Sequence, residues 1–387
     1  IPYGSFDLTT IELPKNNASI AEKEYYFIER DGFIFQAQPS LQGGLEAVLP
    51  NDETPFHSDH VFSRLITNSY RGQSYPFPYA GYYGSFSKAF GPIDSFGFRN
   101  SEDPNSLINR SQDHIVIAVF GGSSAWSPCC LHNETFSYVL EHSLNKYLEQ
   151  ENSVIRRVSV LNFSNLGFTV LNELMTYMLH CHRIKPEIVL THDMFNDLWN
   201  GMCTDKFLLG KHDMTYMADS EVWSAKMLDK HHDSPLSSER PIVNPPQMIV
   251  QSYLRRKKQF QDVVNALGAH YVYGIQPAWT CKKLSKKEHA RMVKIKNSAS
   301  GFLKYYNGVS HLYDMTRGIL AKNPPKHYID VHGAFSEFGP DNDIFVDHAH
   351  LKPEGDSYIA NLYFNEVVKN ILPAICKSRE TNEQHED

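Results

Sequence analysis

Two short segments of this sequence carry side chains that suit nucleophilic chemistry. Gly121-Gly122-Ser123-Ser124 directly follows an apolar run, so a serine there can present its hydroxyl beside backbone N–H groups that point at a developing oxyanion. Near the C-terminus, Asp347 and His350 are spaced so that a carboxylate and an imidazole can share one hydrogen bond. Gly-Ser turns also bind phosphate or serve only as turns, so the first segment alone leaves its use open.

Two more polar segments follow the next two apolar runs. Residues 162–169 read NFSNLGFT, and residues 194–197 read MFND. Both supply hydrogen-bond donors, and in open α/β sheets ligands bind beyond the carboxyl ends of the strands. If each apolar run is a strand of one parallel sheet, these segments and the Gly-Ser turn lie at the same edge.

From about residue 112, short apolar runs alternate with longer amphipathic stretches, which is the pattern of βα units on a parallel sheet. We predict buried strands at 114–120, 158–163, 186–191, 270–275 and 327–331. We predict helices at 133–150, 171–182, 247–267 and 353–375. A further helix begins at the Ser285/Glu288 capping box and runs towards Tyr306, with Gly308 just past its end. The predicted fold class is α/β, a three-layer α/β/α sandwich with a five-stranded parallel sheet, similar to flavodoxin.

The texture of the chain also predicts its domains. Residues 1–110 form an N-terminal extension or small domain rich in aromatic side chains, which pack against the α/β domain or, alternatively, bind a sugar or acyl group. Residues 111–377 form the α/β domain, and residues 378–387 form a polar tail. Residues 199–246 are a long insertion that is either a functional lid or binding loop, or mobile decoration.

Taken together, the four polar segments resemble the SGNH, or GDSL-type, hydrolase superfamily, in the variant with a Gly-Gly-Ser nucleophile block. That family has a nucleophilic serine after the first strand, a glycine after the second, an asparagine in a Gly-x-Asn-Asp block after the third, and a late Asp-x-x-His. The resemblance covers residues 112–375 and is carried here by Ser123, Gly167, Asn196, Asp347 and His350.

The resemblance implies serine-dependent hydrolysis of carboxylic acyl esters through an acyl-enzyme intermediate. Ser123 is then the nucleophile, His350 the general base and Asp347 the group that orients the imidazole. The oxyanion hole comprises the backbone N–H groups of Ser123 and Gly167 and the side-chain amide of Asn196. The implied substrate is a small-molecule, carbohydrate or lipid ester. An acyltransferase with the same triad and a binding protein with a decayed site are the alternatives.

Some assignments stay open at this point. Ser124 is an alternative nucleophile, and His348 is an alternative base, because each lies beside the favoured residue. Met194 replaces the glycine that the family usually has two residues before its asparagine. A bulky side chain there is expected to narrow the acyl pocket or alter the loop, and it is the main support for a decayed site. We predict that Asp197 is structural. Arg99 either lies near the site or, in the interpretation we favour, forms a structural salt bridge.

Composition excludes several function classes. The net charge is −7, with 37 basic and 44 acidic residues and no long run of one sign, which excludes a basic surface for nucleic acid. No apolar stretch approaches the roughly 18–20 residues that a membrane-spanning helix needs. We therefore expect neither a nucleic-acid partner nor a membrane span in this chain, and the oligomeric state stays open.

Cysteine and histidine spacing gives no sign of a metal or cofactor. The six cysteines form no CxxC motif, and the histidine-containing runs 57–60, 180–182 and 231–233 lack a recognised ligand spacing. Ester hydrolysis by a triad needs neither, so we expect no cofactor and no metal. The sequons at Asn17, Asn109, Asn133 and Asn162 favour a secreted, luminal or periplasmic location.

Overall fold

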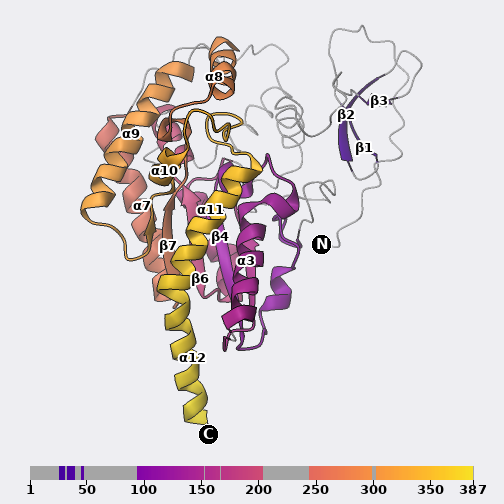
Figure 1. Cartoon of the computed structure of the whole chain (residues 1–387), viewed down its shortest axis with the longest axis vertical. Helices are drawn as coiled ribbons and strands as arrows, with labels where there is room; N and C mark the ends of the chain where they lie inside the picture. The colour runs from indigo at the N-terminus through magenta and orange to yellow at the C-terminus, as the bar shows by residue number, and fades with distance from the viewer. Residues whose placement is uncertain are drawn as a thin grey trace.

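The computed structural model describes residues 94–203, 244–298 and 302–386, except residues 152 and 166, together with the backbone of three short strands nearer the N-terminus (Figure 1). These strands, β1 (Tyr26–Arg30), β2 (Phe33–Pro39) and β3 (Leu45–Ala47), pair antiparallel in the order β1-β2-β3. Most of the predicted aromatic-rich extension and of the 199–246 insertion lies outside the described residues, so those interpretations stay predictions.

A parallel five-stranded sheet forms the centre of the described domain. Its strands are β4 (His114–Gly121), β5 (Arg157–Asn162), β6 (Ile188–Asp193), β7 (His270–Ile275) and β8 (Tyr328–Ile329), in the order β5-β4-β6-β7-β8. The predicted strands are therefore confirmed, with ends that differ from the prediction by at most two residues. Because helices cover both faces of a parallel sheet, both sets of side chains along a strand must be apolar, and β4 is buried at every position.

Two hydrophobic clusters separate the helices into two layers. Alternate residues of β4, namely Val116, Ala118 and Phe120, pack with residues of α4, α5, α7 and α9. The intervening residues, Ile115, Ile117 and Val119, pack with residues of α3, α11 and α12. Figure 1 shows α3 and α11 in front of the sheet and α7 and α9 to its other side. The predicted three-layer α/β/α sandwich is confirmed.

The helices occupy the segments between the strands. The α-helices are α2 (Ser123–Trp126), α3 (Phe136–Glu151), α4 (Val170–Thr176), α5 (Phe195–Cys203), α7 (Pro246–Ala266), α8 (Lys286–Ser298), α9 (Phe302–Lys322), α10 (Val331–Ala334), α11 (Pro353–Glu366) and α12 (Leu372–Glu386). Short 3-10 turns lie at Pro104–Leu107, His132–Glu134, His182–Ile184, Trp279–Cys281 and Phe335–Glu337, and π-turns at Tyr177–Cys181 and Val367–Ile371. Proline at the start of α7 and α11 suits its fixed φ and its missing N–H.

The prediction of one helix from the Ser285/Glu288 capping box towards Tyr306 was wrong. The capping box begins α8, which ends at Ser298, and a second helix, α9, continues to Lys322 with Gly308 inside it. A glycine within a helix costs about 1 kcal/mol relative to alanine. Here α9 buries Val309, Leu312 and Tyr313 in the core, and this packing outweighs the local preference of Gly308 for a helix end.

The C-terminal end also differs from the sequence interpretation. The predicted helix at 353–375 continues through a π-turn into α12, so the residues 378–386 of the predicted polar tail are helical. The π-turn and the start of α12 are held in place because Ile371, Leu372 and Ile375 pack into the core beside α3. In Figure 1 the last turns of this yellow helix extend away from the sheet and the other helices.

Residues 94–110, which the sequence analysis assigned to the extension, pack on the α/β domain. Phe98 is fully buried, and its ring lies edge-on to Phe163, with 5.2 Å between the centroids. The side chain of Asn100 accepts a hydrogen bond of 2.6 Å from the Asn162 N–H at the end of β5. These contacts join residues 94–110 to the described part of the α/β domain.

Asn162 itself cannot serve as a glycosylation site in this fold. Its side chain is buried at the end of β5, where the amide donates to the Ala125 carbonyl at 2.8 Å. Asn109 and Asn133 are exposed. Of the sequons in the described residues, only these two present their side chains for modification.

A cluster of charged side chains is buried between the sheet and α7. The ammonium group of Lys257 donates to Asp193 at 2.7 Å and to Thr191 at 2.5 Å, and the Tyr253 hydroxyl donates to Asp193 at 2.9 Å. Glu173, on α4, is fully buried beside them. Burial and the Asp193 carboxylate raise the pKa of Glu173 well above its ordinary value, so ionisation of this carboxyl group is disfavoured in the folded protein.

We expect Glu173→Gln to increase stability progressively as pH rises. The raised folded-state pKa means that the parent gains full stability from this group below its unfolded pKa and loses it as pH rises towards the folded pKa, by about 1.4 kcal/mol per pH unit. Glutamine keeps the shape without titrating. Urea unfolding of both chains between pH 5 and 8 measures the difference, and a difference independent of pH would show that Glu173 is ionised in the folded protein.

Candidate active site

Ser123 occupies the first position of the short helix α2, directly after β4. The backbone around Gly121 leaves no room for a side chain, and a side chain at position 122 would displace the amide of Asn196. A Cβ atom on Gly121 would lie 2.2 Å from the His192 carbonyl oxygen, and one on Gly122 would lie 2.3 Å from Nδ2 of Asn196. At the first position of a helix the backbone N–H has no acceptor within the helix, so the Ser123 N–H is available to an oxyanion.

Asp347 and His350 lie at the tip of a tight hairpin near the C-terminus. Phe345 pairs with Leu351 in an antiparallel bridge, the Val346 N–H donates to the His350 carbonyl at 2.9 Å, and the Lys352 N–H donates to Ile344 at 2.8 Å. Oδ1 of Asp347 accepts hydrogen bonds of 2.9 Å from the N–H groups of Ala349 and His350. This carboxylate therefore shapes the turn that carries the histidine. We name residues 342–352 the histidine loop.

The structure brings Ser123, His350 and Asp347 together from distant parts of the chain. Nε2 of His350 lies 2.7 Å from Oγ of Ser123, and Nδ1 of His350 lies 2.6 Å from Oδ2 of Asp347. Because a carboxylate only accepts hydrogen bonds, Nδ1 carries a proton, and Nε2 of the neutral ring accepts from the Ser123 hydroxyl. This is the geometry of a nucleophile, a base and an orienting acid.

The charges of this pair reinforce one another. Burial opposes a charge on His350, but the adjacent Asp347 carboxylate and its hydrogen bond raise the pKa of the imidazole above its ordinary value. Burial likewise opposes the charge on Asp347, but His350, His348 and the backbone N–H groups hold the pKa of that carboxyl group well below its usual range. Asp347 is therefore ionised near pH 7, and it stabilises an imidazolium.

The alternatives Ser124 and His348 have other partners. The buried Ser124 hydroxyl donates to the Ala349 carbonyl at 2.9 Å and accepts from Nε2 of Gln276 at 3.0 Å. Ser124 therefore joins residues 121–124, which we name the nucleophile turn, to the histidine loop. The His348 ring packs against Phe195, with 5.0 Å between the centroids. Sequence reasoning missed Gln276, although a polar residue directly after a predicted strand was a signal for this edge of the sheet.

The segments that follow β5 and β6 meet at the nucleophile turn. The Asn165 N–H donates to the Gly121 carbonyl at 3.2 Å, and Gly167 adopts a φ of 71°, in the left-handed region that favours glycine. Nδ2 of Asn196, at the start of α5, donates to the Phe168 carbonyl at 2.8 Å. The predicted residues Gly167 and Asn196 therefore lie in loops that contact each other and the turn carrying Ser123.

Asp197 and Met194 hold the same loops in place. Oδ2 of Asp197 accepts from the Val170 N–H at 3.1 Å, which ties the start of α4 to α5 and agrees with the structural role predicted for Asp197. Met194 adopts a φ of 118°, a region that costs a residue other than glycine about 1–3 kcal/mol. Its side chain is buried in the hydrophobic core, and the amide of Asn196 still lies beside Gly122.

Arg99 lies behind the nucleophile turn and acts through backbone carbonyl groups. Its guanidinium donates to the carbonyl oxygens of Trp126, Ser127 and Cys130 at 3.1, 2.9 and 2.9 Å and lies 4.6 Å from the centroid of the Trp126 ring. Arg99 therefore lies close to the segment that follows Ser123, and these contacts are structural ones to backbone carbonyl groups; the favoured salt bridge stays a prediction. Its role is to hold the segment that follows Ser123.

Within the described residues, no three histidine, cysteine, aspartate or glutamate side chains are grouped so that they could hold a metal ion. The histidine runs 57–60 and 231–233 lie outside that part of the chain. Among the helices of the same ranges, none combines the length and apolar character needed to cross a membrane.

Comparison with protein-family models and with curated proteins finds no match. Among solved structures, the chain is similar to the acetyl xylan esterase AlAXEase, with 11% identity, a TM-score of 0.38 and coverage of 65% of this chain and 100% of that chain. It is also similar to a lipase/acylhydrolase from Enterococcus faecalis, with 13% identity, a TM-score of 0.37 and coverage of 65% of this chain and 95% of that chain. A catalytic mutant of Axe2, an acetylxylan esterase from Geobacillus stearothermophilus, shares 12% identity, with a TM-score of 0.35 and coverage of 65% of this chain and 94% of that chain. Identities and TM-scores this low do not transfer an activity to this chain.

We expect Asp347→Asn to lower the pKa of His350. The parent imidazole should titrate above its ordinary value because Asp347 stabilises the charged ring, whereas burial dominates once that charge is removed. NMR of a histidine-labelled sample, with His350→Gln to assign the resonance, measures both values. If the pKa of His350 is the same in Asp347→Asn as in the parent, the Asp347 carboxylate does not stabilise the charged imidazole.

Proposed function

We propose that this chain is a serine-dependent hydrolase of carboxylic acyl esters and a member of the SGNH superfamily in its Gly-Gly-Ser variant. The observation that carries the proposal is the continuous relay from Asp347 through His350 to Ser123, with contacts of 2.6 and 2.7 Å. Three side chains of these types in this order form the arrangement that activates a serine for attack on a carbonyl carbon.

Acylation begins when Oγ of Ser123 attacks the ester carbonyl carbon. The hydroxyl proton moves to Nε2 of His350, and the carbonyl oxygen becomes an oxyanion. When the tetrahedral intermediate collapses, the bond to the leaving oxygen breaks and Nε2 gives its proton to that alkoxide. The alcohol departs, and the acyl group stays on Ser123.

Deacylation repeats these steps with water. His350 takes a proton from the water that attacks the acyl-enzyme, and the second intermediate collapses as Nε2 returns the proton to Oγ of Ser123. The acid leaves and the enzyme is restored. Throughout, Asp347 keeps the proton on Nδ1 and stabilises the transient imidazolium, which agrees with the raised pKa of His350.

The oxyanion is stabilised by donors from three different loops. These are the backbone N–H groups of Ser123 and Gly167 and the side-chain amide of Asn196. The amide nitrogen carries two hydrogens, and one of them binds the Phe168 carbonyl. The other is available for the oxyanion, and the first fixes the direction in which it points.

Aromatic rings next to the base suggest how a substrate is held. The half-buried rings of Trp199 and His348 stack with 6.3 Å between their centroids, over the buried ring of Phe195, and the His348 centroid lies 6.1 Å from that of His350. Such faces suit the apolar part of an acyl chain or the C–H face of a sugar. The substrate class we propose is therefore a small-molecule, carbohydrate or lipid acyl ester.

Replacing Ser123 with alanine should abolish turnover, whereas replacing Ser124 should not. We expect Ser123→Ala to lower kcat by at least about 10³-fold on a panel of short to long acyl esters, because the nucleophile is lost. Ser124→Ala keeps the nucleophile and loses one contact to the histidine loop, so its kcat should fall much less. Steady-state kinetics of both variants, with unfolding midpoints as a control, make the comparison.

Equal turnover by the parent and Ser123→Ala would overturn the proposal. The same assay with an added acceptor alcohol separates hydrolysis from transfer. If transfer product exceeds free acid at a modest alcohol concentration, the chain is an acyltransferase with the same triad.

Asn196 provides a test of the oxyanion site. We expect Asn196→Ala to lower kcat by about 10²–10³-fold with little change in KM, because the amide acts mainly on charge that develops in the transition state. Asn196→Asp places a negative charge there and should be worse still above the pKa of the aspartate. Equal kcat values for Asn196→Asp and the parent would remove Asn196 from the site.

A further inference from the structure

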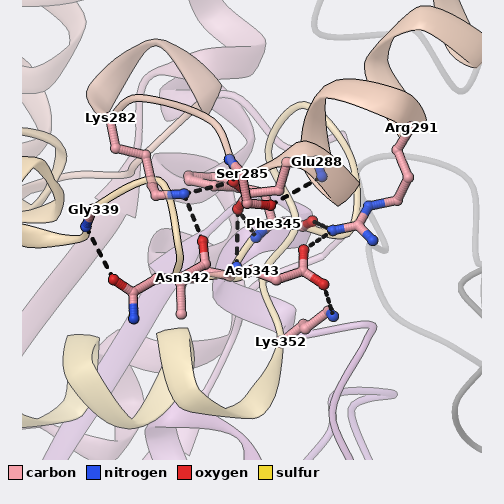
Figure 2. Close-up of polar contacts among 10 residues, drawn as sticks. Lys282, Ser285, Glu288, Arg291, Gly339, Asn342, Asp343, Phe345 and Lys352 are labelled. Atoms are coloured by element: carbon pink, nitrogen blue, oxygen red, sulfur yellow. Dashed lines mark hydrogen bonds and ion pairs between the residues drawn. The ribbon is translucent and has the colours of Figure 1, made fainter.

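A buried acidic side chain that is not part of the relay binds the histidine loop, which carries Asp347 and His350. Glu288, in the first turn of α8, is fully buried, and its carboxylate accepts four hydrogen bonds (Figure 2). Oε1 accepts from the backbone N–H groups of Ile344 and Phe345 at 2.9 and 2.8 Å. Oε2 accepts from the Ser285 N–H at 2.7 Å and from the Lys282 ammonium at 2.6 Å. Half of this capacity thus serves the histidine loop.

The same network grips that loop at further points. The buried Lys282 ammonium also donates to the Asn342 carbonyl at 2.8 Å. Asp343 forms ion pairs with Arg291 of α8 and, at 2.7 Å, with Lys352. Figure 2 shows these side chains converging on residues 342–345 from α8 and from the segment before it. The first arm of the hairpin is therefore attached to α8 and to the segment before it, and Asp343 joins the second arm to the first.

The gripped residues lead directly into the relay. Only Val346 separates Phe345 from Asp347, and Lys352 follows His350 by two positions. The arms pair with each other through Ile344 and Lys352, so a shift of one arm moves the other. The contact between His350 and Ser123 joins this loop to a different part of the chain, and it persists only while the loop is held against the sheet.

Glu288 is suited to this task by its charge. Burial opposes its ionisation, but the hydrogen bonds from Lys282 and from the N–H groups of Phe345, Ser285 and Ile344 hold the pKa of Glu288 below its usual value. A carboxylate accepts several hydrogen bonds at once, and those made to an ionised acceptor are stronger than those made to a neutral one. A helix cap alone uses only the bonds between Ser285 and Glu288.

We propose that Glu288, with Lys282 and Ser285, forms a clamp that positions the Asp347–His350 pair for catalysis. The inference rests on the proposed ester hydrolysis and deepens it, because it identifies a positioning residue that does not touch the reacting atoms. The capping box of α8 thereby has a second use: the carboxylate that completes the cap also holds the histidine loop.

Glu288→Gln tests the clamp, and Glu187→Gln is its matched control. Glu187 also accepts a backbone hydrogen bond, from Val116 at 2.8 Å, and pairs with Arg110 and Arg379, but it lies at the start of β6, the edge of the sheet opposite Ser123. Hydrogen exchange across residues 338–352 measures how firmly the loop is held. Ester hydrolysis at several pH values measures the effect on the relay.

In Glu288→Gln we expect hydrogen exchange at Ile344 and Phe345 to speed up by at least about tenfold. We expect kcat to fall about 10–100-fold with KM nearly unchanged, because misplacement of catalytic groups by a fraction of an ångström is costly. The acid limb of the pH profile should move to lower pH, since a loosened Asp347 raises the pKa of His350 less. Glu187→Gln should show none of these changes even where it lowers stability. If Glu288→Gln fails to fold, Ser285→Ala should give smaller changes in the same direction.

Two failures are distinguishable. Unchanged exchange at Ile344 and Phe345, or equal kcat values for the Glu288 and Glu187 variants at equal stability, overturns the clamp and leaves the proposed function intact. Absence of Ser123-dependent hydrolysis in the parent chain overturns the proposed function, and with it the catalytic role of the clamp.

Discussion

The hydrogen bond between Asp347 and His350 is the interaction on which the rest of the site depends. It sets which ring nitrogen carries the proton and so directs Nε2 at Ser123. It also offsets the cost of removing the Asp347 carboxylate from water. The same carboxylate accepts two hydrogen bonds from backbone N–H groups in its own turn. The shape of the histidine loop and the charge of its acid are therefore maintained by one set of contacts, and neither can change alone.

The sheet makes this convergence possible by ending several strands at one edge. The segments after β4, β5 and β6 approach one another so closely that a side chain at position 121 would meet the His192 backbone and one at position 122 would displace the Asn196 amide. Met194 adopts a backbone conformation that favours glycine, and Asp197 and Asn196 bridge neighbouring loops. The two hydrophobic clusters beneath this edge pack on the strands that carry these loops.

Local sequence patterns, such as apolar runs and capping residues, predicted the fold well but predicted some helix ends and the choice of serine poorly. The apolar runs located each strand within a few residues, because a parallel strand covered on both faces must be continuously apolar. The helix that was expected to stop near Gly308 instead corresponds to α8 and α9, and α9 continues past Gly308 to Lys322, because burial of α9 outweighs a local preference. The choice between Ser123 and Ser124 was similarly beyond local information, since both follow the same turn.

The sequence by itself determined the α/β class, the order of the strands along the chain and the residue types available at the active edge, because these follow from hydrophobic periodicity and from the chemistry of single side chains. Tertiary structure alone decided which serine meets which histidine, that Ser124 and Gln276 bind the histidine loop, and that Glu288 reaches across to residues 344 and 345. These contacts join residues far apart in the chain, and their geometry is set by how strands and helices pack, which no short stretch of sequence encodes.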